Sequence, residues 1–168
     1  MSYYRAIWDS GVWLWTVIFS SVVAFVAVMV LVQSSKLGER MTTFVVGSIA
    51  VMLLCIIACA PRGFIVDHRT LKVRTVAFTL SYDLKDLKDV QTVDSSEVFG
   101  AGTIRTFGVG GLFGYYGFYR TQKWGNVRAF VTDRNKLVLV KIGGKVLVLS
   151  PEKPDEFTKL LQLGENMK

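Results

Sequence analysis

The stretch GVWLWTVIFSSVVAFVAVMVLV occupies residues 11–32, and the stretch MTTFVVGSIAVMLLCIIACA occupies residues 41–60. Neither stretch contains a charged residue. A helix needs about 20 predominantly apolar residues to cross the hydrocarbon core of a bilayer. The two stretches therefore predict a pair of transmembrane helices and place the chain in the class of integral membrane proteins.

The segments around these stretches predict how the two helices are arranged. Residues 1–10 form a short polar and aromatic lead, and residues 33–40 (QSSKLGER) connect the stretches. A connection this short allows only an antiparallel hairpin. It contains two cations, whereas the flanks of the hairpin contain Arg5, Arg62, Arg69, Lys72 and Arg74. Because cytoplasmic flanks carry the excess of Lys and Arg, we expect both termini in the cytoplasm.

The composition limits the kinds of partner that the rest of the chain can have. The formal net charge is +7, and the two cysteines, Cys55 and Cys59, both lie in the second apolar stretch. The segment after Pro61 therefore cannot be stabilised by disulfides. Its basic character would suit anionic lipid headgroups, although scattered cations serve solubility equally well. Nucleic acid is not an expected partner, because the sequence contains neither a basic helix nor a known nucleic-acid motif.

After Pro61 the hydrophobic pattern changes from long apolar runs to short alternating segments. We expect strands at residues 64–67, 71–75, 76–82, 88–93, 127–132, 137–142 and 145–149. A single helical turn is expected at residues 83–86, and Gly143-Gly144 is typical of a two-residue hairpin loop. An amphipathic helix is predicted at about residues 154–163, with acids in its first turn. About seven short strands with tight turns predict a small barrel or sandwich that this helix closes at one end.

The segment VFGAGTIRTFGVGGLFGYYGFYR, at residues 98–120, contains seven of the 15 glycines. It lacks the Gly-Lys-Ser/Thr ending of a phosphate loop, so nucleotide binding is not expected. Three interpretations of this glycine–aromatic segment stay open. Its aromatic residues fill or cover the barrel, insert at the bilayer interface, or form a self-association or partner surface. The candidate interaction residues are Phe107, Gly110, Gly111, Leu112, Phe113, Tyr115, Tyr116, Phe118 and Tyr119.

Residues that could carry catalysis are scarce. His68 is the only histidine and falls in an expected turn. Three aspartates at positions 83, 86 and 89 are interrupted by lysines, and no calcium-loop pattern follows them. No serine lies in a nucleophile-elbow motif. We therefore expect no catalytic, cofactor or metal site, and an unrecognised hydrolase is the remaining enzymatic alternative.

Four segments together resemble the bacterial pleckstrin-homology-like (bacterial PH) domains of small membrane proteins. They are RGFIVD at 62–67, TFGVGGLFGYYGFY at 106–119, FVTD at 130–133 and VLSPEKPDEF at 148–157. The resemblance covers about residues 63–163. It implies a seven-stranded, strongly bent β-barrel with a C-terminal helix that plugs one end. It also implies assembly into oligomers rather than phosphoinositide binding.

The expected protein is an α+β membrane protein in two parts. Residues 1–61 form the transmembrane hairpin, with helices at about 11–32 and 41–60, and residues 62–168 form the PH-like domain. The expected function is a non-catalytic interaction or scaffold module at the bacterial inner (cytoplasmic) membrane. It self-associates as a homo-oligomer or binds a protein partner. The alternative is a module that senses an anionic lipid or a peptide through the glycine–aromatic segment. The candidate lipid-headgroup contacts are Arg62, Arg69, Lys72 and Arg74.

Overall fold

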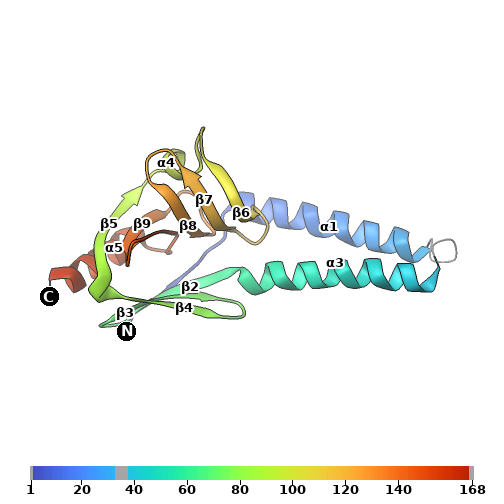
Figure 1. Ribbon diagram of the computed structural model, residues 1–168, viewed down its shortest axis with the longest axis horizontal. Helices are drawn as coiled ribbons and strands as arrows, with labels where there is room; N and C mark the ends of the chain where they lie inside the picture. Colours follow the sequence, from blue (N-terminus) through green and yellow to red (C-terminus); the bar gives the residue numbers. More distant parts are fainter. Residues whose placement is uncertain (1, 33–37, 167–168) are drawn as a thin grey trace.

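Two long helices extend side by side from one end of a β-rich domain (Figure 1). The computed structural model describes residues 2–32 and 38–166. Helix α1 spans Ser10–Val32 and helix α3 spans Glu39–Cys59. The connection expected between them lies largely outside the described residues, including its Lys36.

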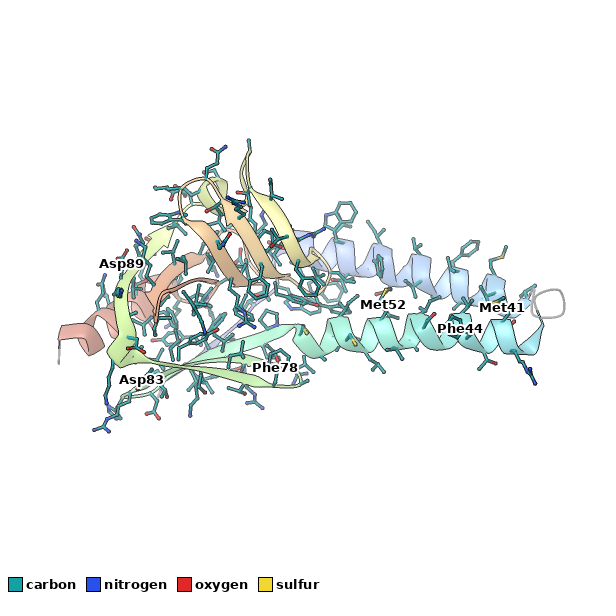
Figure 2. The ribbon with its side chains drawn as sticks, in the orientation of Figure 1. Met41, Phe44, Met52, Phe78, Asp83 and Asp89 are labelled. Atoms are coloured by element: carbon teal, nitrogen blue, oxygen red, sulfur yellow. The ribbon has the colours of Figure 1, made fainter. Side chains whose placement is uncertain are left out.

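Both helices are long and apolar enough to cross a membrane by length and composition. Their apolar side chains are largely exposed. Phe25 on α1 is 66% exposed and Phe44 on α3 is 73% exposed, and Figure 2 shows Phe44 near the end of the hairpin that is far from the domain. Exposing such side chains to water costs about 25 cal/mol per Å² of apolar surface. A bilayer core would cover the same surface without that cost.

The first sheet joins the chain's N-terminus to the strands that follow the hairpin. Its four strands are antiparallel, in the order β1 (Ser2–Arg5), β2 (Pro61–Val66), β3 (Thr70–Thr75) and β4 (Thr79–Asp83). The expected strands after Pro61 are present here, but β1 was not predicted. The lead before the first helix is a strand that pairs with β2.

The second sheet has six strands, and the glycine–aromatic segment supplies two of them. Their order is β5 (Leu87–Val93), β9 (Leu137–Ile142), β10 (Lys145–Leu149), β8 (Gly125–Val131), β7 (Tyr115–Thr121) and β6 (Ile104–Gly110). Among the strands of the described residues, only the β8–β10 pair is parallel. A 3₁₀ turn, η1 (Leu84–Asp86), precedes β5, and a short helix, α4 (Ser95–Phe99), follows it.

The strand arrangement does not confirm the expected seven-stranded barrel. In the described residues nine strands, β2 to β10, follow the hairpin, and they form two separate sheets rather than a closed barrel. The two additional strands are β6 and β7, whose high glycine content obscures the alternation typical of strands. Strands β4 and β6 each end a sheet.

The main core lies between the two sheets and the C-terminal helix α5 (Pro154–Asn166). Phe157 of α5 is fully buried, and its ring packs edge-on against Tyr4 of β1 and Phe64 of β2, with centroid distances of 5.1 and 6.1 Å. A second cluster lies on the other face of the second sheet, where Val98 of α4 covers Tyr119 and Leu139. The helix expected at the C-terminus thus closes the space between the sheets.

Candidate functional site

The glycine–aromatic segment folds into the β6–β7 hairpin, and its glycines account for the tightness of that hairpin. Gly108 and Gly117 are cross-strand partners with φ of 123° and 135°. A Cβ on either residue would collide with the backbone of the opposite strand, so only glycine fits. At the tip, the amide of Gly111 donates to the carbonyl of Gly114 at 3.0 Å. These glycines permit close backbone pairing.

The tip of this hairpin docks on the first turns of α1. The amide of Phe113 donates to the hydroxyl of Thr16 at 3.1 Å. The Phe113 ring packs edge-on against Trp8, just before α1, with a centroid distance of 5.8 Å. Leu112 beside it is buried. The hairpin tip is therefore attached to the domain-side end of the helical hairpin.

Asp9 provides a second attachment between the start of α1 and the domain, at the β8–β9 turn. One carboxylate oxygen accepts from the amide of Val12 at 2.6 Å, which caps the helix. The other accepts from the amide of Arg134 at 3.2 Å. The amide of Asp9 donates to the carbonyl of Thr132 at 3.0 Å. Asp9 thus caps the N-terminus of α1 and also binds the β8–β9 turn.

The end of α3 is held in the same manner. The last carbonyls of a helix have no partner within the helix. Here the hydroxyl of Tyr116 donates to the carbonyl of Ile56. The amide of Ala77, in the β3–β4 turn, donates to the carbonyl of Ala58 at 3.0 Å. Because both helix ends bond to the β domain, the hairpin and the domain are coupled at their junction.

The candidate residues of the glycine–aromatic segment divide by exposure. Tyr116 and Tyr119 are buried in the two core clusters. Burial raises the pKa of both phenols above the usual value, so their hydroxyls stay protonated and donate hydrogen bonds. Phe113 and Tyr115 are half-buried. Phe107 and Phe118, in contrast, are 75% and 47% exposed.

The exposed aromatic residues lie together beside an unpaired strand edge. Phe107 pairs with Phe118 across the β6–β7 ladder, and Ile104 pairs with Arg120, so their side chains share one face. Ile104 is 64% exposed. The guanidinium of Arg128 lies 5.3 Å from the centre of the Phe118 ring. Because β6 ends the sheet, this apolar face adjoins backbone groups that have no strand partner on their outer side among the residues that the structure describes.

The candidate lipid-headgroup contacts fall into two places. Lys72 and Arg74 lie on the outer face of the first sheet, and Arg62 is exposed at the start of β2. Arg69 lies in the β2–β3 turn, at the end of the domain far from the helices (Figure 1). The structure therefore places Lys72 and Arg74 on one face of the first sheet, Arg62 at the start of β2, and Arg69 in the turn at the other end of β2.

Arg5, which was not predicted as a lipid-headgroup contact, lies near Arg74 across the first sheet. The register places Arg5 opposite Gly63 and Gly63 opposite Arg74. Since paired residues point to the same face, Arg5 and Arg74 flank a residue without a side chain. The sequence gives only a weak indication that Arg5 lies in a strand beside β2, because that strand has only four residues.

The residues considered for catalysis have structural roles or lie in solvent. His68 is in an exposed turn, and its amide donates to the carboxylate of Asp67 at 2.9 Å. Asp83 accepts from the amide of Lys85 at 3.0 Å, and Asp89 forms an ion pair with Lys141 at 3.0 Å. Both aspartates lie in the part of the domain far from the helices (Figure 2). Within the described ranges, no group of three or more His, Cys, Asp or Glu residues could hold a metal ion.

Comparison with protein families agrees with the resemblance noted in the sequence. A family model described as "Bacterial PH domain" matches residues 62–163. The match begins with β2 and ends within α5, so it covers both sheets except β1. No curated protein and no solved structure matched the chain.

Proposed function

Because the chain belongs to the bacterial PH domain family, we propose that it is a non-catalytic interaction module anchored in a membrane, and that it self-associates through strand β6. The domain division at Pro61 is part of this proposal. The proposed location is the bacterial inner membrane, with both termini in the cytoplasm. An anchored module of this kind would hold its binding surface at a fixed height above the bilayer.

The membrane part of the proposal is supported by the two apolar helices and by the junction. Both helices are long enough to span a bilayer. The strand before α1 pairs with the strand after α3, so both flanks of the hairpin lie on the same side. The cations of that side, among them Arg5, Arg62 and Arg74, favour its assignment to the cytoplasm.

The observation that carries self-association is the exposed apolar face at the edge of the second sheet. Ile104, Phe107 and Phe118 are exposed there beside the outer edge of β6. An unpaired edge strand is a template for pairing with a second chain. Two copies related by a two-fold axis can pair their β6 strands antiparallel and continue the sheet across the interface. Anchoring in the same membrane raises the effective concentration of the copies.

The test is the mass of the full-length protein in nanodiscs, measured by native mass spectrometry. We expect a discrete oligomer for the wild type and a shift to the monomer for Phe107→Asp, because the charge enters the proposed contact. The side chain of Phe107 is 75% exposed, so the substitution should leave the fold intact. Leu163→Asp is the matched control, since Leu163 is 61% exposed on α5. A monomeric wild type, or equal dissociation by both variants, contradicts self-association through β6.

A further inference from the structure

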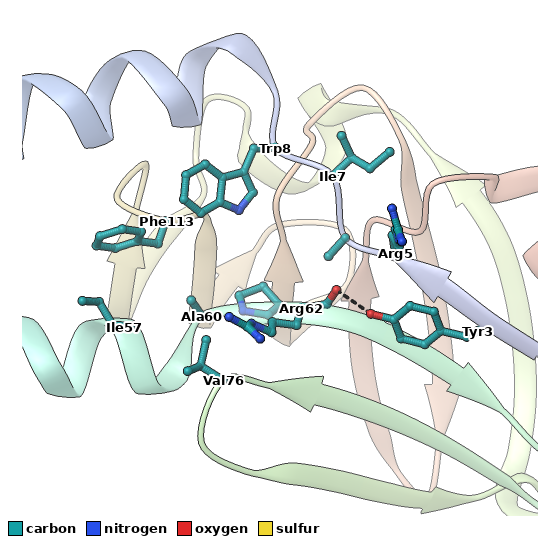
Figure 3. Close-up of a pocket in the computed structure, with 11 residues that line it drawn as sticks. Tyr3, Arg5, Ile7, Trp8, Ile57, Ala60, Arg62, Val76 and Phe113 are labelled. Atoms are coloured by element: carbon teal, nitrogen blue, oxygen red, sulfur yellow. Dashed lines mark hydrogen bonds between the residues drawn. The ribbon is translucent and has the colours of Figure 1, made fainter.

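A cleft lies at the junction of the helical hairpin and the domain (Figure 3). Its volume is about 480 Å³. In Figure 3, Trp8 and Phe113 lie on the side of α1, and Ile57 and Val76 lie on the side of α3 and the β3–β4 turn. The lining is mostly apolar, and Arg5 and Arg62 are its two charged residues.

The walls of this junction cleft are fixed by hydrogen bonds to backbone carbonyls. The carbonyl of Arg62 accepts from the amide of Ala6 and from the hydroxyl of Tyr3, each at 3.2 Å. These bonds hold the β1–α1 connection against β2, and the Tyr3 bond is drawn in Figure 3. On the opposite side, the amide of Val76 donates to the carbonyl of Ala60 at 3.0 Å. The cleft is thus a preformed feature, as ligand sites usually are.

The charges of the cleft favour an anion. No acidic residue is among the described residues that line it. Arg5 and Arg62 are both exposed, and neither forms an ion pair with any residue that the structure describes. The amide of Glu152 donates to the carbonyl of Arg5 at 3.0 Å, but the Glu152 carboxylate is in none of the ion pairs among the described residues. Arg74 is not part of the lining: it lies across Gly63 from Arg5, and the Tyr3 ring covers Gly63.

We propose that the junction cleft binds one anionic phospholipid from the leaflet that faces the domain. The phosphate lies against Arg5 and Arg62, because guanidinium groups bind phosphate through paired hydrogen bonds. The first part of the acyl chains lies against Trp8, Ile57 and Phe113. The inference rests on the proposed insertion of α1 and α3 in a bilayer, which places the cleft at headgroup level. A lipid is favoured over a soluble anion because most of the cleft lining is apolar, including Trp8 just before α1 and Ile57 of α3.

The experiment measures lipid that stays bound to the full-length protein. The protein is reconstituted in nanodiscs containing equal amounts of phosphatidylglycerol and phosphatidylcholine, and bound lipid is counted by native mass spectrometry. We expect one phosphatidylglycerol per chain. In the double variant Arg5→Gln/Arg62→Gln, the bound phosphatidylglycerol per chain should fall by a factor of about ten or more. A tenfold loss requires only about 1.4 kcal/mol of binding free energy.

Two controls separate this site from general charge effects. Arg69→Gln/Lys88→Gln removes the same number of charges at exposed positions outside the cleft and should retain lipid like the wild type. Val76→Trp keeps every charge but fills the cleft, and it should lose lipid. Val76 is 42% exposed, so the larger ring should not disturb the core. Equal lipid retention by the Arg5/Arg62 variant and its control overturns the proposal.

A further arm distinguishes a lipid from its phosphate alone. Glycerol 3-phosphate added in excess should not displace the bound phosphatidylglycerol, because it lacks acyl chains. Displacement would assign the site to a soluble phosphate ligand and overturn the lipid proposal.

Carbonate extraction of membranes tests insertion separately. Loss of lipid binding with intact insertion rejects only the cleft proposal, whereas extraction of the protein by carbonate rejects the membrane-anchored function.

Discussion

The amide of Phe113 donates to the hydroxyl of Thr16 at 3.1 Å, and this bond joins residues 97 positions apart. Phe113 has a φ of 56°, and it is the one non-glycine residue with positive φ in the described part of the chain. A bulky residue in this conformation costs free energy that surrounding contacts must offset. The bond to Thr16 and the ring contact with Trp8 provide those contacts. The hairpin tip is therefore shaped by its attachment to α1.

Replacing Thr16 should loosen this attachment. In Thr16→Val the amide of Phe113 loses its acceptor, which costs about 1–2 kcal/mol for a partly buried donor. Hydrogen exchange of residues 111–114, measured by mass spectrometry in nanodiscs, should then be about tenfold faster. Ser21→Ala is the control, because the Ser21 hydroxyl bonds to the carbonyl of Val17 in its own helix at 2.9 Å. Unchanged exchange in Thr16→Val would show that the bond does not hold the tip.

The glycine pair of the hairpin should tolerate no side chain. Gly117→Ala places a methyl group against the carbonyl of Phe107 at a φ of 135°, so both sterics and backbone conformation oppose it. We expect a loss of at least about 3 kcal/mol in the free energy of unfolding, measured by denaturant titration in detergent. Gly144→Ala also has positive φ, 72°, but faces open space, and should cost only about 1 kcal/mol. Equal costs would contradict the close approach of β6 and β7.

The phenol of Tyr116 should make the protein sensitive to alkaline pH. Burial raises its pKa above the usual value near 10. Above pH 10 the unfolded phenol loses its proton while the folded one keeps it, so stability falls as pH rises and is unaffected below pH 10. At pH 11 this amounts to about 1.4 kcal/mol. Tyr116→Phe should therefore lose less stability than the wild type between pH 8 and pH 11. An equal loss would show that this phenol is not protected in the folded state.

The packing of helix α5 against the two sheets should depend on the ring of Phe157. Phe157 is fully buried and contacts both Tyr4 and Phe64. Phe157→Ala should destabilise the protein by about 3–5 kcal/mol because it leaves a cavity between the sheets. Leu163→Ala, at an exposed position of the same helix, should change stability by less than about 0.5 kcal/mol. Both values follow from thermal or denaturant unfolding, and a small effect of Phe157→Ala would contradict the role of α5 as the closing element.

Local patterns predicted much of the secondary structure. The uncharged stretches predicted α1 and α3, since each helix carries its apolar signal within its own residues. Alternation predicted β2, β3, β4, β5, β8, β9 and β10, and the paired acids after Pro154 predicted α5. The motifs that resembled bacterial PH domains were confirmed by the family match over residues 62–163. Each of these signals lies within a short segment.

The candidate site was predicted only in part. The glycine–aromatic segment was predicted to be an interaction segment, but its two strands were not predicted. Glycines interrupt the alternation on which strand prediction depends. Arg69 was grouped with Lys72 by proximity in sequence, although the β2–β3 turn places it far from the helices. Arg5 was not selected, because a strand of four residues gives too short a pattern.

By itself the sequence determined the two long apolar helices, most strands and the family of the domain, because these depend on residues close together in the chain. Tertiary structure alone decided three things: the pairing of β1 with β2, the attachment of Phe113 and Tyr116 to the two helices, and the cleft between Arg5 and Arg62. Each of these brings together residues roughly 50 to 100 positions apart. Contacts over such separations leave no periodic pattern in the sequence, and they arise only when the sheets and helices pack.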